Sequence, residues 1–316
     1  MKKLVVSSSP HISSPLTTRR VMLEVIIALL PAAVMGVVIF GIRALAVLAV
    51  TVSVAVLSEF IFNYLTKKKQ TVDDLSAIVT GLLLGMNLRA DAPLWQCALG
   101  SIFAIVVVKC LFGGLGCNFA NPAITARVFL VISFTGTVGG GARPWLSAIS
   151  PSSSLVSGAT PLEIIGKTGD LPSLLDMFLG IRPGAIGETC IAALLVGFIY
   201  LAVRKIINFE VPLIFVGTVF VLSLIAYSDF STALYQILSG GLVLGAVFMA
   251  TDYVTTPITR SGKMIFAFGC GLITFLIRYF GTYPEGVSYA ILFMNILSPY
   301  IEKWTAPRAL GGKKNA

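Results

Sequence analysis

Histidine is nearly absent from this chain, and charged residues are scarce. The single histidine, His11, lies in a polar N-terminal segment, so the chain lacks the residues for a histidine-dependent nucleophilic triad or a histidine-rich metal site. Charged residues make up 12% of the 316 positions and hydrophobic residues 56%, whereas an ordinary soluble domain has about 25% charged residues. The composition argues against a hydrolase and indicates an integral membrane protein.

Recognisable disulfide, metal and nucleotide motifs are also lacking. The five cysteines lie in or beside apolar segments and no two form a CxxC pair, so we expect free, buried thiols. The glycine-rich run 113–116 lacks the Lys-Ser/Thr of a phosphate-binding loop. It either lets helices approach closely or lines a pocket at a broken helix. The net charge of +9 comes from residues at the ends of apolar runs, which indicates membrane topology rather than nucleic-acid binding.

What the chain does contain is a series of apolar segments, each a candidate membrane helix of about 20 residues. The segments are 21–40, 44–65, 75–88, 94–111, 115–136, 186–203, 211–228, 234–251, 263–281 and 286–301. We predict an all-α membrane protein of about ten transmembrane helices. Residues 1–20 and 302–316 form polar tails at the two ends.

The basic residues predict which way the chain is oriented. If the N-terminus is cytoplasmic, sixteen lysines and arginines face the cytoplasm and six face outside, as the positive-inside rule requires. Both tails are then cytoplasmic. The polar stretch 137–185 follows the fifth span and is predicted to be extracytoplasmic.

The two halves of the chain resemble each other. The sequence GLLLG at 81–85 recurs as GLVLG at 241–245, on the third span of each half. The fourth spans also end alike, at Lys109 and at Arg278. These correspondences predict an internal repeat.

An odd number of spans per half makes the repeats 21–136 and 186–301 inverted relative to each other. Inverted repeats place a functional site at their interface, beside short or Gly/Pro-interrupted helices. The candidate interruptions are the short third span, Pro122, Gly245 and Pro299.

Two charged residues in or beside the spans are candidate functional residues. Arg127, inside a span, costs at least about 2.5 kcal/mol unless an anion accompanies it, and that anion is either a ligand or a carboxylate of another helix. Asp252 lies beside Thr251, Thr255 and Thr256, whose oxygens suit Na⁺ or H⁺ coupling; equally, it caps the following segment. Three glutamates near helix ends, Glu24, Glu59 and Glu188, are expected to be interfacial or paired.

A short string of small residues, Ser157-Gly158-Ala159-Thr160, lies midway along the polar stretch. Such residues let an extended, exposed segment enter the cleft of a modifying enzyme, where a threonine hydroxyl can be esterified. Four small residues in a loop are a weak signal by themselves. Their place in an otherwise apolar chain makes Thr160 a candidate cofactor attachment point.

Four motifs occur in order along the chain: Phe119-Ala-Asn-Pro-Ala123, Ser157-Gly-Ala-Thr-Pro-Leu162, Phe248-Met-Ala-Thr-Asp252 and Tyr283-Pro-Glu-Gly-Val287. With them the chain resembles the D subunit of Rnf ferredoxin:NAD⁺ oxidoreductase complexes. It resembles less closely the homologous B subunit of sodium-pumping NADH:quinone reductase. The resemblance covers almost the whole chain.

The resemblance implies that Thr160 carries FMN through a phosphoester bond made by a flavin transferase outside the cytoplasm. Ser157, Gly158 and Ala159 match the transferase pattern, whereas Ser154 stands where that pattern often has an acidic residue. The subunit would not catalyse a reaction alone. It would relay electrons between ferredoxin and NAD⁺, coupled to outward movement of Na⁺ or H⁺ across a prokaryotic inner membrane.

The resemblance also implies partners: other Rnf subunits, including a flavoprotein subunit and iron-sulfur membrane subunits, as well as the flavin transferase and membrane lipid. A second, noncovalent flavin such as riboflavin is an open alternative near Asn121 and Arg127. The inverted-repeat fold equally describes a solute channel or secondary transporter. A structural scaffold for other membrane subunits is a third interpretation.

Overall fold

The computed structural model describes residues 17–142, 144, 160–165, 171–281 and 285–307. Within these ranges the regular structure is helical, and the only β-type pairing is an isolated antiparallel bridge between Ala142 and Gly184. The predicted all-α fold is therefore confirmed for the described part of the chain.

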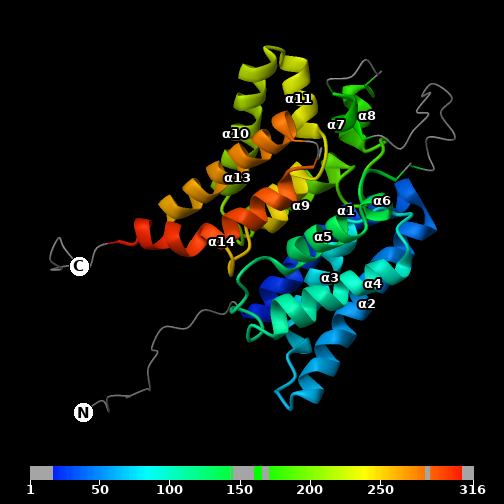
Figure 1. Cartoon of the computed structure of the whole chain (residues 1–316), viewed down its shortest axis with the longest axis vertical. Helices are drawn as coiled ribbons and strands as arrows, with labels where there is room; N and C mark the ends of the chain where they lie inside the picture. Colours follow the sequence, from blue (N-terminus) through cyan, green and yellow to red (C-terminus); the bar gives the residue numbers. More distant parts are fainter. Residues whose placement is uncertain (1–16, 143, 145–159, 166–170, 282–284, 308–316) are drawn as a thin grey trace, which may run out of the picture.

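The first half contains five main helical segments (Figure 1). They are α1 (Thr18–Phe40), α2 (Ile42–Leu65), α3 (Ser76–Met86), α4 (Leu94–Ile102) continued by the π-helix η2 (Phe103–Cys110), and α5 (Pro122–Ser133). A 3₁₀ turn, η1 (Val72–Asp74), leads into α3. Helix α2 packs against both α3 and α4.

The second half repeats this pattern of packing. Its segments are α9 (Ile191–Val203), α10 (Glu210–Tyr227), α11 (Phe230–Leu238), α12 (Leu242–Leu244) continued by the π-helix η4 (Gly245–Met249), α13 (Arg260–Phe280) and α14 (Val287–Thr305). Helix α10 packs against α11 and α13. When α11, α12 and η4 are counted as one bent segment, the second segment of each half thus contacts the third and the fourth.

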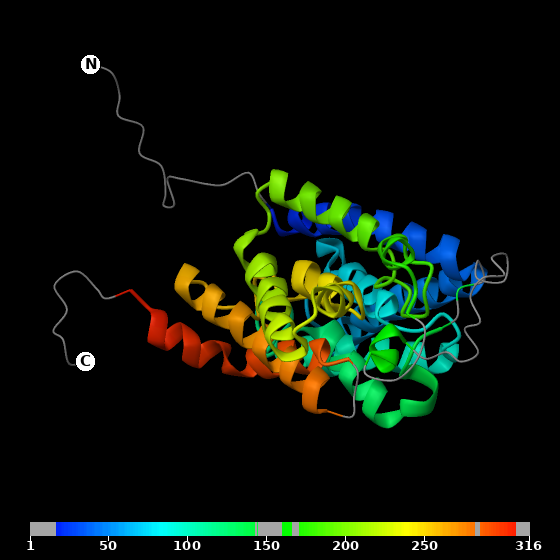
Figure 2. The same cartoon turned by 90° about the horizontal axis from the view of Figure 1, so that it is seen from above.

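The halves meet along two helix pairs, α1 with α9 and α5 with α14. Figure 2 shows α1 and α9 side by side. Their close approach depends on Gly197, because a β-carbon there would lie 2.3 Å from the carbonyl oxygen of Ala28 and 2.9 Å from the ring of Phe248. The interface at which the sequence places a functional site is therefore tightly packed in this region.

Three short helices lie between or beside the halves: α6 (Thr135–Val138), α7 (Pro161–Ile164) and α8 (Leu174–Leu179). The sequence predicts only a polar loop over most of this stretch. The chain then docks on the end of α3, where the amides of Ile186 and Gly187 donate to the carbonyl oxygens of Leu88 (3.0 Å) and Met86 (2.7 Å). The start of the second half is thereby fixed to the first.

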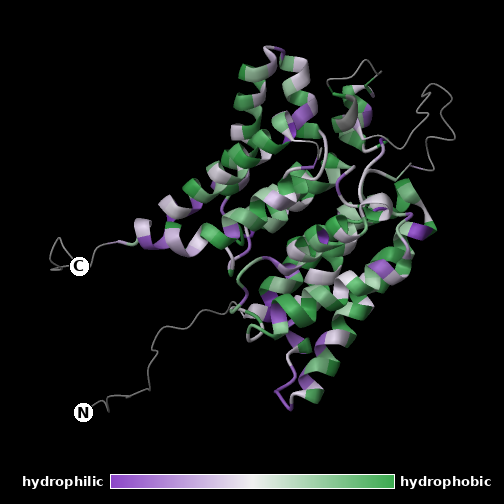
Figure 3. Cartoon of the chain, in the orientation of Figure 1, coloured by the Kyte–Doolittle hydropathy of each residue, from purple (hydrophilic) through white to green (hydrophobic). Residues whose placement is uncertain are grey.

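In the part of the chain that the structure describes, four helices, α1, α2, α10 and α13, are long and apolar enough to cross a membrane. Helix α11 with α12 and η4, a pair bent by 62°, adds a fifth if it forms one span. Four further apolar segments, α3, α4 with η2, α5 and α9, have 10 to 17 residues. In Figure 3, green marks hydrophobic residues, and it recurs along most of the helices. The ten crossings and the orientation of the termini stay predictions.

The fifth predicted span begins later than the sequence predicts. Residues 111–121 form turns, and α5 begins at Pro122 rather than at 115. Gly113, Gly114 and Gly116 have φ angles of 119°, 95° and 94°, a region that L-residues with a β-carbon avoid. Pro122 then occupies the first turn of α5, where proline is favoured.

The helix break in the second half also differs from the predicted positions. It occurs at Gly240, whose φ is 64°, between α11 and α12. Gly245 lies where α12 passes into η4, and Pro299 lies inside the continuous helix α14. Neither of these two residues therefore interrupts the chain as sharply as Gly240.

Candidate functional site

Thr160 is buried, with 3% of its surface exposed, although the sequence predicts an exposed segment. Ser157, Gly158 and Ala159 lie outside the described residues. A β-carbon added to Gly141 would lie 3.0 Å from Thr160 Cγ2 and 2.7 Å from the amide nitrogen of Gly184. Thr160 thus packs on the backbone next to the Ala142–Gly184 bridge, and this close approach requires glycine at 141.

Next to the same bridge lies a fully buried arginine. Arg182 is 1% exposed, and its Nη2 donates to the backbone oxygen of Glu188 at 2.9 Å. Its buried Nε has no hydrogen-bond partner in the described structure. Burial lowers the pKa of Arg182 to about 10, against the opposing effect of the Glu188 charge. The guanidinium therefore stays positively charged at neutral pH.

Glu188 is also 1% exposed. Its Oε1 accepts from the amide of Ala185 at 2.9 Å, and its Oε2 has no hydrogen-bond partner in the described structure. A β-carbon added to Gly241 would lie 3.2 Å from Glu188 Oε2 and 4.0 Å from both Arg127 Nη1 and Asn87 Oδ1. The loop before α9, the end of α3, helix α5 and the start of α12 therefore converge at Gly241.

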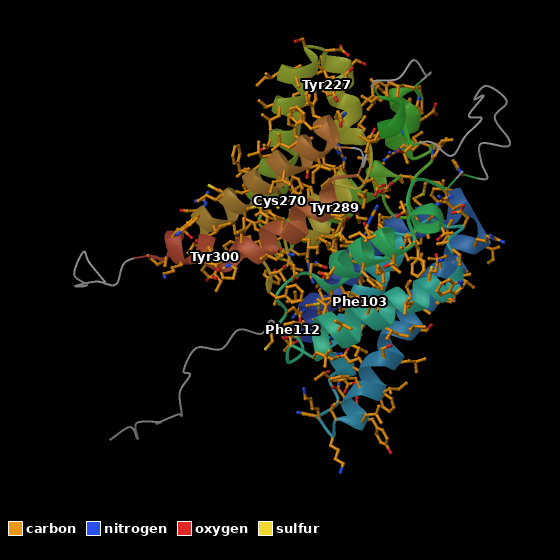
Figure 4. The ribbon with its side chains drawn as sticks, viewed as in Figure 1. Phe103, Phe112, Tyr227, Cys270, Tyr289 and Tyr300 are labelled. Atoms are coloured by element: carbon orange, nitrogen blue, oxygen red, sulfur yellow. The ribbon has the colours of Figure 1, made fainter. Side chains whose placement is uncertain are left out.

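Arg127 has the anionic partner that the sequence requires, and that partner is a protein carboxylate. Its Nη2 forms a salt bridge with Glu285, and its Nη1 donates to Asn87 Oδ1. The other carboxylate oxygen of Glu285, Oε1, is buried without a hydrogen-bond partner in the described structure. Tyr289 of α14, labelled in Figure 4, lies at the same junction and interacts electrostatically with Arg127.

Arg278, in the last turn of α13, reaches the segment that contains Thr160. Within the described ranges it donates to neutral oxygens only, those of Gln236 and, at 3.2 Å, the carbonyl of Ser239. A β-carbon added to Gly240 would lie 3.1 Å from Arg278 Nη2 and 2.8 Å from Leu162 Cδ1. Arg278 and Leu162 therefore meet at Gly240.

These charged residues form one group, here called the arginine cluster: Arg127, Arg182, Arg278, Glu188 and Glu285. Glu188 acts electrostatically on all three arginines. Six buried polar atoms in or beside the cluster lack partners in the described structure: Arg182 Nε, Glu188 Oε2, Thr189 Oγ1, Ser239 Oγ, Arg278 Nε and Glu285 Oε1. Since buried polar atoms are normally hydrogen-bonded, the cluster has unused donors and acceptors for a polar group.

A second polar region is a cavity between the two halves. Its volume is about 80 Å³. Its walls include Ser76, Lys109, Asn118, Asn121 and Asp252. The Oδ1 atom of Asn118 is buried and has no hydrogen-bond partner in the described residues. The cavity therefore joins polar residues from both halves.

Asp252 forms no salt bridge within the described part of the chain. Its carboxylate accepts from Thr255 Oγ1 at 3.1 Å and from the amide of Val254 at 3.3 Å, and Thr256 donates to its carbonyl oxygen at 2.6 Å. Thr251 instead donates to Val247. Both interpretations of Asp252 thus have a structural basis, because the residue caps the following turn and also lines the cavity.

Asn121 and Arg127, which the sequence places in one site, belong to different environments. Asn121 lines the cavity, and its side chain caps α5 by accepting from the amides of Ala123 (3.0 Å) and Ile124 (3.3 Å). Arg127 instead lies in the arginine cluster. Helix α5 therefore contributes separate residues to two polar regions.

Comparison with known proteins identifies the family. The sequence profile described as the NQR2, RnfD, RnfE family matches residues 5–311. The chain belongs to this family. It is 46% identical over 315 residues to the D subunit of the Na(+)-translocating ferredoxin:NAD(+) oxidoreductase complex of Acetobacterium woodii, covering 98% of this chain and 96% of the relative.

Further members of the NQR2, RnfD, RnfE family are similar over nearly the same length. The D subunit of the proton-translocating ferredoxin:NAD(+) oxidoreductase complex of Clostridium ljungdahlii is 40% identical over 325 residues, covering 98% of this chain and 96% of the relative. The D subunit of the ion-translocating oxidoreductase complex of Stutzerimonas stutzeri is 38% identical over 326 residues, covering 92% of each. The resemblance found in the sequence motifs is thereby confirmed.

Several residues of the arginine cluster are missed by sequence reasoning. From the sequence, Arg182 and Arg278 are only two of the six basic residues predicted to face outside, and Glu188 is predicted to be interfacial or paired. Glu285 falls inside the Tyr283–Val287 motif without being singled out. Apart from Arg127, which the sequence singles out, the parallel endings of the fourth spans at Lys109 and Arg278 are the signal that points to a further member, Arg278.

Proposed function

We propose that the protein is the D subunit of an Rnf-type ion-translocating ferredoxin:NAD⁺ oxidoreductase, and that it carries FMN on Thr160 through a phosphoester bond. Family membership and the names of the relatives support the first part. One observation carries the second: Thr160 lies beside a buried arginine cluster with a surplus positive charge and unused hydrogen-bonding atoms. A phosphate-bearing cofactor fits those properties.

The flavin, when bound, supplies the electron-carrying chemistry between ferredoxin and NAD⁺. The chain supplies an attachment oxygen, Thr160 Oγ1, on a segment that the Ala142–Gly184 bridge supports. Since Thr160 is buried, a transferase has to act before the segment 160–165 packs on Gly141 or has to lift it away. The buried surroundings then exclude water from the linkage.

Coupling to Na⁺ or H⁺ movement is proposed at the cavity beside Asp252. A carboxylate without a salt bridge, surrounded by hydroxyl and carbonyl oxygens, suits a hard monovalent cation or a proton. A noncovalent flavin such as riboflavin is an alternative occupant of the same cavity. Because the cavity volume of about 80 Å³ is well below the range of about 300–1,000 Å³ typical of ligand sites, its walls would have to move apart to admit a flavin. Asn118 Oδ1 and Asn121 are the residues available to it.

The proposed setting is a prokaryotic inner membrane, with the segment around Thr160 on the extracytoplasmic side. The partners are the other Rnf subunits, among them a flavoprotein subunit and iron-sulfur membrane subunits, together with the flavin transferase during maturation. This chain performs no complete reaction alone, since it contains one station of the relay.

The experiment is coexpression of the chain with its flavin transferase, followed by denaturing electrophoresis and mass spectrometry. The wild-type band should fluoresce under ultraviolet light, whereas Thr160→Ala should be dark because the attachment oxygen is gone. Thr274→Ala is the matched control, since Thr274 is a buried threonine of α13 outside the arginine cluster and its loss should leave fluorescence intact. A dark wild-type band with unmodified Thr160 would disprove covalent attachment.

A further inference from the structure

Two arginines flank the segment that follows Thr160. Arg182 lies two residues before Gly184 of the bridge on which Thr160 packs, and Arg278 meets Leu162 at Gly240. They come from different parts of the chain, one from the loop before α9 and the other from the end of α13. Their shared position beside residues 160–162 is therefore a product of the fold.

The charges around these arginines do not balance. Arg127 is paired with Glu285, which leaves Arg182 and Arg278 with Glu188 as the remaining acidic member of the cluster. Neither arginine donates to a carboxylate in the described structure, because the acceptors are neutral oxygens of Glu188, Gln236 and Ser239. Among the described residues one positive charge is thus uncompensated, in a place where an unpaired charge is costly.

The hydrogen-bonding capacity of the two arginines is also incomplete. The Nε atoms of both Arg182 and Arg278 are buried without a partner in the described residues. A guanidinium presents its donors in a planar fork that matches the oxygens of a phosphate group. What the pair lacks is therefore an anion with several acceptor oxygens.

We propose that Arg182 and Arg278 form the subsite for the phosphate group of the flavin ester, with Glu188 as their shared counter-charge. This inference rests on the proposed attachment of FMN to Thr160. A phosphate esterified to two alcohol oxygens keeps one negative charge at neutral pH, which equals the surplus of the pair. Arg278 and Leu162, two residues after Thr160, both approach Gly240, and Arg182 lies two residues before Gly184, whose backbone is next to Thr160.

The subsite can be tested without esterification, in the full-length Thr160→Ala chain held in lipid nanodiscs. Quenching of flavin fluorescence measures the affinities for FMN and for riboflavin. The two flavins differ only by the phosphate of FMN. FMN should bind at least about tenfold more tightly, because its phosphate adds hydrogen bonds between charged groups that riboflavin cannot form. One such bond strengthens binding over a neutral hydrogen bond by about that factor in affinity. Adding Arg182→Gln or Arg278→Gln should bring the ratio of the two affinities close to one.

Lysine variants and a distant arginine keep the test falsifiable. Arg182→Lys and Arg278→Lys retain the charge but not the fork, so part of the FMN preference should remain. Arg204→Gln is the matched control, because Arg204 pairs with Glu24 at the junction of α1 and α9 and should leave the ratio unchanged. Size-exclusion chromatography identifies variants that fail to fold, and the other arginine then serves for the comparison.

The outcomes separate the subsite from the proposed function. If wild-type Thr160 is esterified but FMN and riboflavin bind equally to Thr160→Ala, the subsite is wrong and the proposed function stands. A preference for FMN that survives both glutamine variants also overturns the subsite. If wild-type Thr160 is unmodified, the proposed ester attachment of FMN is wrong. An FMN preference that still depends on both arginines would then mean that they bind the phosphate of a noncovalent ligand.

Discussion

Lys109 and Arg278 occupy corresponding places, at the end of the fourth helical segment of each half, yet their surroundings differ. Lys109 is 1% exposed, and its Nζ donates to Glu59 Oε2 at 2.8 Å and to Ser76 Oγ at 2.6 Å. The hydroxyl of Thr71 donates to the other oxygen of Glu59 at 2.5 Å. Among the described residues, Arg278 donates hydrogen bonds to neutral oxygens only.

The difference shows how similar halves can serve different purposes. Both halves carry a cation at this place, but among the residues that the structure describes only the first half supplies a bonded carboxylate to neutralise it. Lys109 and Glu59 thus form a closed ion pair that joins α2 to η2, whereas Arg278 retains a charge and an unused donor for something else. A repeat therefore identifies a candidate position, and the local counter-charge decides whether it is structural or available to a ligand.

The largest expected effect comes from breaking the closed pair. Lys109→Met leaves the Glu59 carboxylate buried without its cation, which costs about 3–5 kcal/mol of folding stability. The double variant Glu59→Gln with Lys109→Met removes both charges and should recover most of that loss. Thermal unfolding in detergent, followed by fluorescence-detected size-exclusion chromatography, compares the three proteins. A double variant no more stable than Lys109→Met would contradict the closed-pair interpretation.

Arg278→Met should destabilise the protein less, since no carboxylate is bonded to Arg278. The change leaves the acceptor oxygens of Gln236 and Ser239 without a donor, at a cost of about 1–3 kcal/mol. It also removes the repulsion between Arg278 and Arg182. The same unfolding measurement applies. A loss as large as that of Lys109→Met would mean that Arg278 is held by a carboxylate after all, and the contrast between the halves would disappear.

The sequence predicts the long helices well because their apolar runs are continuous. Helices α1, α2 and α13 begin and end within a few residues of the predicted spans. It fails where the backbone changes direction within an apolar run. The turns before α5 and the break at Gly240 depend on positive φ angles, which hydrophobicity does not encode.

The candidate site is only partly predictable for a different reason. Thr160, Arg127 and Asp252 each stand out as a polar residue in an unusual place along the chain. The partners of Arg127 come from distant segments, the end of α3 and the loop before α14, and a single sequence does not reveal which segments meet. Residues such as Glu285 and Arg182 become functional candidates only through the contacts that the fold creates.

The smallest expected effect concerns the support of Arg278 by α11, whose C-terminal end provides its acceptor oxygens. Asp229 caps the N-terminus of α11, accepting from the amides of Ser231 (3.2 Å) and Thr232 (2.8 Å). The pKa of Asp229 is lowered, chiefly by the hydrogen bond from the Thr232 hydroxyl. The stability that its charge contributes is therefore present above pH 3.8, the ordinary value, and is lost as the pH falls through the lowered pKa.

Asp229→Asn keeps a capping oxygen but removes that charge. Its melting temperature should lie slightly below that of the wild type at pH 7, and the difference should shrink below pH 3.8 as the wild-type carboxylate becomes protonated. A difference that does not change with pH would mean that the cap acts through its geometry alone. The charge of Asp229 would then contribute nothing to the helix that holds Arg278 beside the Thr160 segment.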